Sequence, residues 1–365
     1  MSTFDEVRAS GEQLAARLER LAEASSRNAG HHCWIERLPP EASLAHAAPA
    51  DGPLSGLTFA IKDNIDLAGV PTTAACPAFA YVPERSATAV ARLLAAGAAP
   101  LGKTNLDQFA TGLVGTRSPY GACRNALFPD HVSGGSSSGS AVAVALGEAD
   151  FALGTDTAGS GRIPAAFNGL VGLKASRGLV PTTGVVPACR SLDCVTTFTR
   201  SVADAAELLD LLADPDGEDP SARRIPPRWF RGPPRVAVPP TAALAFPDPA
   251  YGPEAFDAAR ARLVELGCEL VELDPTPFLA AGDLLYSGPW VAERTAAVGD
   301  FLRAHPDAVH PVTAKIIGGG EGLDAVATFR GFDRLRELAL AANRVFEQAD
   351  AVLLPTADRF PTLAE

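Results

Sequence analysis

The chain has 365 residues, of which 47% are hydrophobic, and its formal net charge at neutral pH is −12. A chain of this size can bury a large core, as one α/β domain or as two smaller ones. The acidic balance argues against nucleic acid or an anionic membrane surface as partner, and no apolar run has the length of a membrane span or the form of a signal peptide. We therefore expect a cytoplasmic protein.

Apolar spacing and turn residues predict helices that alternate with strands. Expected helices lie at residues 3–28, 87–97, 106–112, 138–149 and 201–214, and long helices fill 276–346. Expected strands lie at 57–62, 99–103, 151–155, 235–240 and 351–355, and a helix followed by a strand spans 253–273. Pro-rich composition predicts a loop at 38–53 and a linker at 215–234. This alternation favours a layered α/β domain around a mostly parallel or mixed sheet.

Two motifs suggest cofactors, but their context does not support either of them. Residues 97–104 (GAAPLGKT) match the P-loop pattern, yet a P-loop needs a strand before it and a helix after it, and here a helix precedes Gly97. His31-His32-Cys33 has no second ligand cluster at a spacing suitable for a metal. The six cysteines form no C-x-x-C pair and are expected to be buried free thiols. We expect no nucleotide and no metal.

Two Gly/Ser-rich loops, GGSSSGS at 134–140 and DTAGSGR at 156–162, suit acyl-transfer chemistry. Glycines let backbone N–H groups approach a developing negative charge, and serines can attack a carbonyl carbon. No G-x-S-x-G elbow is present, and His131 is the only histidine near these loops, which argues against a Ser-His-Asp triad. What remains is serine with lysine, because a neutral amine can remove the hydroxyl proton.

Lysine is scarce, with four lysines among 31 basic residues. Arginine cannot lose its proton at working pH, whereas a buried lysine can. Lys62 ends a predicted strand, where open α/β sheets place active sites, and burial there would lower its pKa. The alternative role for Lys62 is a structural salt bridge to Asp63 or Asp66.

The run from Gly134 to Ser176, together with AIKDNID and GKTNLDQFATG, resembles the amidase signature family. The resemblance implies an α/β fold with a large central mixed sheet covered by helices on both faces. It also implies a Ser–cis-Ser–Lys triad, in which Ser160 is the nucleophile, Ser136 the bridging residue with a cis peptide bond, and Lys62 the base.

The same resemblance implies an oxyanion hole made by backbone N–H groups at the nucleophile. Preorganised donors of this kind stabilise the negative charge of a tetrahedral intermediate. The residues it designates are Thr157, Ala158, Gly159 and Ser160 itself. Asp156 is interpreted as structural.

Three segments are similar to the allophanate hydrolase subfamily: GGSSSGS, residues 187–205, and LLYSGPWVAER at 284–294. The similarity implies that Tyr286 and Arg294 grip the substrate carboxylate, and eight helical steps would bring them near one face of a helix. The alternative is a core-facing tyrosine and a surface ion pair between Arg294 and Glu293. Gly112 is a candidate for a backbone carbonyl contact to the amide nitrogen.

The sequence therefore predicts an amidase that hydrolyses allophanate (urea-1-carboxylate), releases ammonia through a carbamoyl-enzyme and needs no cofactor. Two alternatives stay open: an amidase for another small amide or acid, including a glutaminase-type amidotransferase subunit, and a non-catalytic amidase-like protein. Residues 1–50 are expected to form an N-terminal helical segment and loop, and 51–365 the catalytic domain. The family pattern predicts a domain shortened at its C-terminal end, no separate C-terminal domain, and a homodimer.

Overall fold

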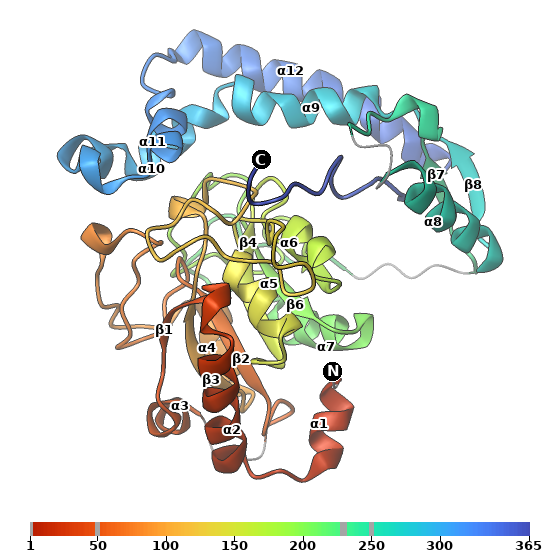
Figure 1. Cartoon of the computed structure of the whole chain (residues 1–365). Helices are drawn as coiled ribbons and strands as arrows, with labels where there is room; N and C mark the ends of the chain where they lie inside the picture. The colour runs from red at the N-terminus through yellow and green to blue at the C-terminus, as the bar shows by residue number, and fades with distance from the viewer. Residues whose placement is uncertain (1–2, 48–51, 227–231, 248–251) are drawn as a thin grey trace. The chain divides into compact units, whose positions relative to one another are not determined.

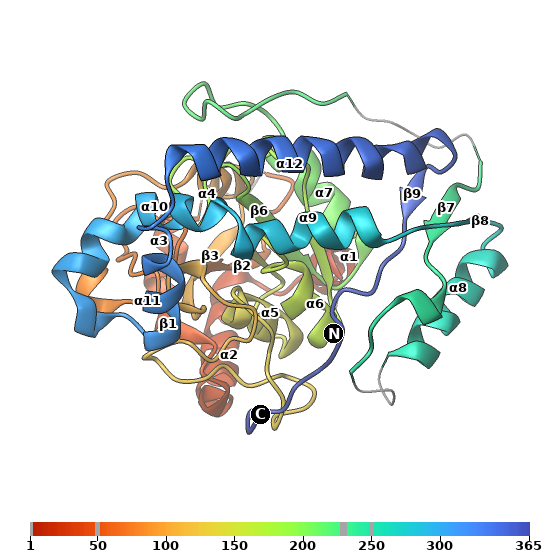
Figure 2. The same ribbon diagram turned by 90° about the horizontal axis from the view of Figure 1, so that it is seen from above.

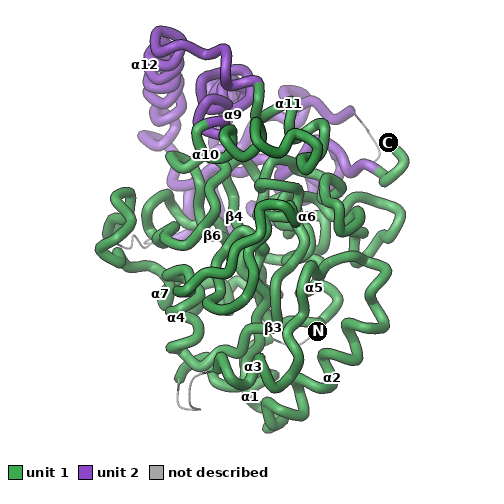
Figure 3. The backbone as a smooth tube through the Cα atoms, turned by 90° about the vertical axis from the view of Figure 1, so that its left-hand side faces the viewer, with its two compact units in different colours: residues 1–225, 296–318, 362–365 green, residues 226–295, 319–361 purple. Residues whose placement is uncertain are grey.

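The computed structural model describes residues 3–47, 52–226, 232–247 and 252–365. These residues form two compact units (Figure 3). Unit 1 comprises residues 1–225, 296–318 and 362–365, and unit 2 comprises 226–295 and 319–361. Residues on both sides of position 50 belong to unit 1. The domain boundary expected there stays a prediction.

Unit 1 is built on a six-stranded sheet. Its strands are β1 (Trp34–Arg37), β2 (Thr58–Lys62), β3 (Ala99–Thr104), β4 (Phe151–Asp156), β5 (Val171–Lys174) and β6 (Cys194–Thr199). Their order is β1-β3-β2-β4-β6-β5. Strand β2 pairs in parallel with β3 and β4, whereas β6 is antiparallel to both β4 and β5. The expected mixed sheet is confirmed, although no strand was predicted at the positions of β1, β5 and β6.

Helices cover both faces of this sheet (Figure 1). They are α1 (Phe4–Ser10), α2 (Leu14–Arg27), α3 (Pro40–His46), α4 (Thr88–Ala95), α5 (Ser138–Ala145), α6 (Arg162–Phe167) and α7 (Val202–Leu212). Unit 1 also contains α11 (Pro311–Gly318) and the 3-10 turns η1 (Ala29–His31), η2 (Pro77–Phe79), η3 (Gln108–Ala110) and η5 (Pro306–Ala308). Because side chains alternate along a strand, Phe59 and Ile61 of β2 pack in the same core cluster as α1, α4 and α7, and Ala60 packs with α2, α5 and α6.

Three local predictions for unit 1 are wrong, each because of a backbone feature. The helix expected at 3–28 is divided by Gly11, whose φ of 65° ends α1. The loop expected at 38–53 contains α3, which starts at Pro40 in the position where proline favours a helix start, while residues 48–51 lie outside the described part. Residues 106–112 form only the turn η3, because Phe109 and Ala110 have φ of 52° and 51°.

The context of the P-loop-like stretch is as expected. Helix α4 precedes Gly97, and residues 99–104 of the motif are themselves strand β3. All six cysteines are free thiols, and five of them are buried, as predicted. None of the helices in the described ranges combines the length and the hydropathy that a bilayer crossing requires.

Unit 2 has a sheet of its own, with three parallel strands in the order β8-β7-β9. The strands are β7 (Arg235–Val238), β8 (Glu269–Glu272) and β9 (Ala351–Val352). The helices are α8 (Pro253–Glu265), α9 (Thr276–Ser287) and α12 (Ala325–Asn343), with turns η4 (Thr241–Ala243) and η6 (Arg344–Glu347). Helices α9 and α12 lie side by side (Figures 1 and 2), and α10 (Trp290–Ala304) continues from unit 2 into unit 1. The predicted linker at 215–234 forms no helix or strand in its described part; residues 227–231 lie outside that part.

Candidate active site

The candidate site begins where β2 ends. Strands β2 and β4 are parallel neighbours, so their carboxyl ends, Lys62 and Asp156, lie at the same edge of the sheet. Lys62 is completely buried. Its Nζ donates hydrogen bonds to Ser136 Oγ at 2.7 Å and to Thr155 Oγ1 at 2.8 Å. The structure therefore brings together two of the three residues expected in the triad.

The alternative salt bridge of Lys62 to Asp63 or Asp66 is not the arrangement that forms. Asp63 pairs with the buried Lys103 at 3.1 Å. Asp66 accepts hydrogen bonds from Tyr81 and Thr72, each at 2.8 Å. Both carboxylates are thus engaged elsewhere, and Lys62 is left facing hydroxyl groups.

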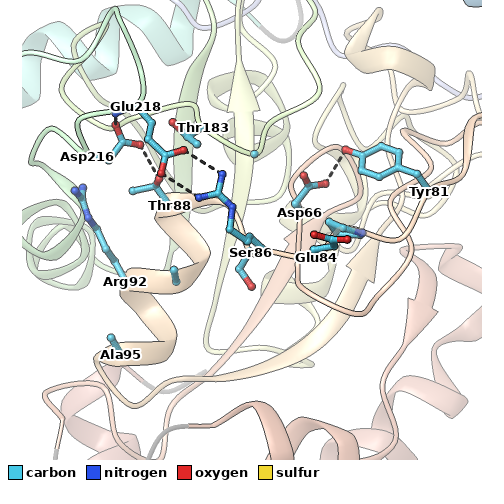
Figure 4. Close-up of a pocket in the computed structure, with 14 residues that line it drawn as sticks. Asp66, Tyr81, Glu84, Ser86, Thr88, Arg92, Ala95, Thr183, Asp216 and Glu218 are labelled. Carbon is cyan, nitrogen blue, oxygen red and sulfur yellow. Dashed lines mark hydrogen bonds and ion pairs between the residues drawn. The ribbon is translucent and has the colours of Figure 1, made fainter.

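Asp66 and Tyr81 line a separate cavity of about 930 Å³ in unit 1 (Figure 4). Arg85 and Glu218 form an ion pair there at 3.1 Å. No residue of the expected triad lines this cavity. It contains neither a serine of the two Gly/Ser-rich loops nor Lys62, so it is distinct from the candidate site.

Burial controls the protonation of Lys62. Removal from water disfavours the ammonium form and lowers the pKa of Lys62 to about 7, against the opposing charges of Asp107, Asp193 and Asp156. At neutral pH much of this amine is therefore unprotonated. A neutral amine in contact with the Ser136 hydroxyl is able to take its proton.

The two serine loops are joined by hydrogen bonds. The Gly135–Ser136 peptide bond is cis, as the family resemblance implied, and Ser136 is fully buried. The Ser137 N–H donates to the carbonyl oxygen of Ser160 at 3.1 Å. The Ser137 hydroxyl accepts from the Thr155 N–H at 3.2 Å and donates to the Thr155 carbonyl at 3.0 Å. These contacts hold the Ser136 loop against the loop that carries Ser160.

Asp156 shapes the loop around Ser160, in agreement with its predicted structural role. Its carboxylate accepts the N–H groups of Gly159 at 2.8 Å and of Gly161 at 3.1 Å. Arg162 binds the same carboxylate with Nε at 2.9 Å and Nη2 at 2.8 Å. Burial alone would raise the pKa of Asp156, but the contacts with Arg162 and the backbone outweigh it and hold the pKa below its usual value. The carboxylate therefore stays ionised.

The expected oxyanion donors differ in their availability. The Gly159 N–H is already bound to Asp156. Throughout the described ranges, the N–H groups of Thr157, Ala158 and Ser160 take part in no hydrogen bond. These three donors remain available to an anion at Ser160.

Three polar residues near the site were not recognised from the sequence. Thr155 accepts from Lys62, and Asp193 accepts from the Thr157 hydroxyl and from the Ala188 N–H at 2.9 Å. Asp107 accepts backbone N–H groups of the loop that follows Gly112. Their partners are side chains distant in sequence, such as Lys62 and Thr157, or nearby backbone groups in irregular loops, so no spacing pattern indicated them.

Tyr286 and Arg294 do come together, but not on one helix. Helix α9 ends at Ser287, Gly288 and Pro289 intervene, and α10 begins at Trp290, because proline cannot continue the helical hydrogen-bond pattern. The guanidinium carbon of Arg294 lies 5.6 Å from the centre of the Tyr286 ring. Arg294 is 2% exposed and Tyr286 45% exposed, which is the reverse of the alternative with a buried tyrosine and a surface arginine. Both residues belong to unit 2.

Gly112 is buried in the loop after η3. A Cβ atom at this position would lie 2.5 Å from Asp107 Oδ2, so only glycine fits there. The contact predicted for its carbonyl group stays a prediction.

The amidase family model matches residues 12–365, and the chain therefore belongs to the amidase family. It is 44% identical over 91% of its length to the urea amidolyase of Lachancea kluyveri, of which it covers 19%. It is 38% identical to a glutamyl-tRNA(Gln) amidotransferase subunit from Symbiobacterium thermophilum, with coverage of 84% of this chain and 69% of that protein.

The fold agrees with this membership. The allophanate hydrolase of Kluyveromyces lactis superposes on the whole chain with a TM-score of 0.91 and 37% identity, and the match covers 62% of that protein. The chain thus spans about a fifth of the curated urea amidolyase and less than two thirds of the solved hydrolase. These matches show the amidase family and its fold.

Proposed function

We propose that this protein hydrolyses allophanate to release ammonia. The observation that carries the chemistry is the buried Lys62 amine at 2.7 Å from Ser136 Oγ, with its pKa lowered to about 7. The 44% identity to a urea amidolyase supports the choice of substrate. Residues 51–365 would form the catalytic domain, with residues 1–50 as an N-terminal addition.

In the proposed reaction, neutral Lys62 takes a proton from Ser136, which takes one from Ser160. The Ser160 oxygen attacks the terminal carbamoyl carbon, and a bond to the amide nitrogen breaks after that nitrogen has received the proton. Ammonia leaves, and the carbamoyl-enzyme that remains carries the substrate carboxylate on its nitrogen. Water, deprotonated by the same relay, then attacks this ester and frees Ser160.

The oxyanion would be held by the loop from Thr157 to Ser160. The unused N–H groups of Thr157, Ala158 and Ser160 support this role. Gly159 would join them only if its N–H moved away from Asp156. Each such donor typically contributes about 3–4 kcal/mol to transition-state stabilisation.

Substrate selection is proposed for Tyr286, Arg294 and Gly112. An arginine fork and a phenolic hydroxyl recognise a carboxylate, which a neutral amide lacks. The cation–π contact of Arg294 with Tyr286 supports their acting as a pair. The Gly112 carbonyl would accept from the amide nitrogen.

The test is ammonia release from a panel of allophanate, glutamine and neutral amides. Ser160→Ala should release no ammonia from any substrate while keeping its circular dichroism spectrum, and Ser26→Ala, on the exposed side of α2, should be fully active. Arg294→Lys should raise KM for allophanate without changing KM for a neutral amide. Full turnover by the Ser160 variant would rule out the proposal.

The second candidate is a glutaminase-type role within an amidotransferase, which the 38% identity to such an enzyme's subunit supports. Glutamine hydrolysis faster than allophanate hydrolysis would favour it. A non-catalytic role would instead be indicated if an active-site phosphonate failed to label Ser160.

Assembly and location are proposed from the family resemblance alone: a homodimer in the cytoplasm, with a small amide or carboxylate as its partner. Light scattering after size exclusion would measure the mass of the particle. A mass equal to one chain would exclude the dimer.

A further inference from the structure

Asp107 is a fully buried carboxylate for which the proposed reaction has no use. Its oxygens accept the N–H groups of Val114 at 3.2 Å, Gly115 at 3.0 Å and Arg117 at 3.0 Å. All three donors lie in the loop that begins at Gly112. One side chain therefore fixes most of the backbone of that loop.

The backbone of Asp107 is bound to the catalytic turn. Its N–H donates to the carbonyl oxygen of Ser136 at 3.1 Å. The side chain and the main chain of one residue thus connect the Gly112 loop with the bridging serine.

The glycines around Asp107 show how closely these segments approach it. A Cβ at Gly112 would lie 2.5 Å from Asp107 Oδ2, and a Cβ at Gly135 would collide with the same oxygen. Two glycines from different loops are therefore required around a single carboxylate. The backbone between Asp107 and Gly112 is also held in the left-handed region at Phe109 and Ala110, which non-glycine residues adopt only when the surroundings enforce it.

We propose that Asp107 is a positioning residue, which holds the Gly112 loop and the Gly135–Ser136 turn in register for catalysis. The inference deepens the proposed function and rests on it. Asp107 does not touch the reacting atoms; it acts through the two segments that do.

The charge of Asp107 also affects the pKa of Lys62, which provides a second way to test this role. Lys62 is surrounded by the hydroxyls of Ser136 and Thr155 and by the charges of Asp107, Asp193 and Asp156, of which Asp107 opposes the lowering of the Lys62 pKa most strongly. Removing that charge should lower the pKa of Lys62 further. The base would then become active at a lower pH.

The experiment measures the rate at which a fluorophosphonate labels Ser160 between pH 5.5 and 9. Asp107→Asn should move the midpoint of the pH profile to lower pH and reduce the plateau rate by about tenfold or more, because loop displacement misaligns the relay. Asp107→Glu keeps the charge but adds a methylene, so it should keep the midpoint and lose rate. The matched control is Asp219→Asn, whose carboxylate accepts the N–H groups of Thr182 and Ser221 away from the triad; it should change neither quantity.

Wild-type hydrogen exchange provides a test that needs no variant. The amides of Val114, Gly115 and Arg117 should exchange at least about tenfold more slowly than unstructured reference peptides. Exchange at the reference rate would overturn the proposal even if Asp107→Asn did not fold. So would an Asp107→Asn protein with an unchanged profile and rate.

These measurements distinguish a failure of the Asp107 proposal from a failure of the proposed function. A wild-type enzyme whose Ser160 is labelled but which releases no ammonia from allophanate would refute the substrate, while the comparison of Asp107 variants would still stand. A wild-type enzyme without labelling would refute the triad, and hydrogen exchange would still decide whether Asp107 holds the loop.

Discussion

Lys62 and Lys103 end or nearly end adjacent strands and are both fully buried, but their partners differ. Lys103 forms an ion pair with Asp63. Lys62 contacts two hydroxyls, and in the described ranges no carboxylate is within ion-pair distance of it. A buried ammonium without a contacting counterion is costly, so burial shifts Lys62 toward its neutral form.

Replacing Lys62 by methionine should stabilise the protein while abolishing its activity. Folding lowers the pKa of Lys62 from its ordinary value of 10.5 to about 7, so between pH 7 and pH 10.5 the unfolded chain binds more protons than the folded one. Wild-type stability therefore rises with pH across this window, and the charge cost is greatest below pH 7. Lys62→Met should gain on the order of a few kcal/mol at pH 7 and progressively less toward pH 10.

Urea unfolding of both proteins at pH 7 and pH 9.5 measures this difference. Lys315→Met is the control, because Lys315 is exposed on α11. A Lys62→Met variant less stable than wild type at pH 7 would contradict the expectation.

Thr155→Val should impair catalysis without unfolding the protein. The substitution preserves shape but removes the acceptor that holds Lys62 Nζ at 2.8 Å. We expect kcat to fall by about tenfold or more, since the amine loses its orientation toward Ser136. Thr197→Val on β6 is the matched control, because the Thr197 hydroxyl is buried with no hydrogen-bond partner. Steady-state kinetics should show a wild-type rate for the control; equal losses in both variants would instead indicate a general packing effect.

The sequence designates the residues proposed to carry the chemistry more readily than the residues that hold them in place. Lys62, Ser136 and Ser160 lie in motifs with recognisable composition, so a single chain is enough to designate them. Thr155 contacts Lys62, which is 93 positions away in the sequence. Asp107 contacts backbone groups 7 to 10 positions away. Both sets of contacts exist only after folding. No pattern in the sequence encodes that geometry.

At the scale of helices, the break between α9 and α10 decides how Tyr286 and Arg294 meet. Pro289 fills this break and packs against Gly331 of α12, where a Cβ would collide with the proline ring. The turn therefore depends on a residue about 40 positions later in the chain, a dependence that helical periodicity cannot predict. The resemblance designated Tyr286 and Arg294, and their side chains do make contact, but the continuous helix assumed in the spacing argument does not form.

Gly331→Ala should destabilise unit 2 even though alanine favours a helix. The added methyl group overlaps Pro289, a rigid neighbour, and we expect a loss of about 1–3 kcal/mol. Gly282→Ala is the matched control: Gly282 is also helical, in α9, but has nothing within 4 Å of its Cβ position, so alanine should stabilise by about 0.5–1 kcal/mol. Opposite shifts of Tm in a melting experiment are expected. Shifts of the same sign would refute the packing argument.

Strand prediction depended on context in a similar way. Strands β2 and β4 are continuous buried apolar runs and were predicted at nearly their observed bounds. Strand β6 (CVTTFT) is equally buried, but its polar threonines interrupt the apolar run by which a buried strand is recognised in a sequence. Strand β1 (WIER) has two apolar residues followed by two charged ones, so its four positions show no strand period.

At the scale of the whole molecule, the net charge of −12 opposes binding to phosphate backbones. We therefore expect the isolated protein not to bind tRNA at physiological salt, even at about 10 μM protein. Fluorescence anisotropy of labelled tRNA tests this, with a basic RNA-binding protein as positive control. Dissociation constants below about 1 μM would favour the amidotransferase alternative.

The four lysines, all of which lie in the described ranges, have a practical consequence for chemical labelling. Lys62 and Lys103 are fully buried, and Lys174 is half-buried and hydrogen-bonded to Cys194 Sγ at 3.4 Å. Of the four, Lys315 alone is exposed to solvent. A succinimidyl ester used in limiting amount should therefore attach among the lysines mainly to Lys315, so one dye or one surface linkage could be placed on α11 without engineering a cysteine.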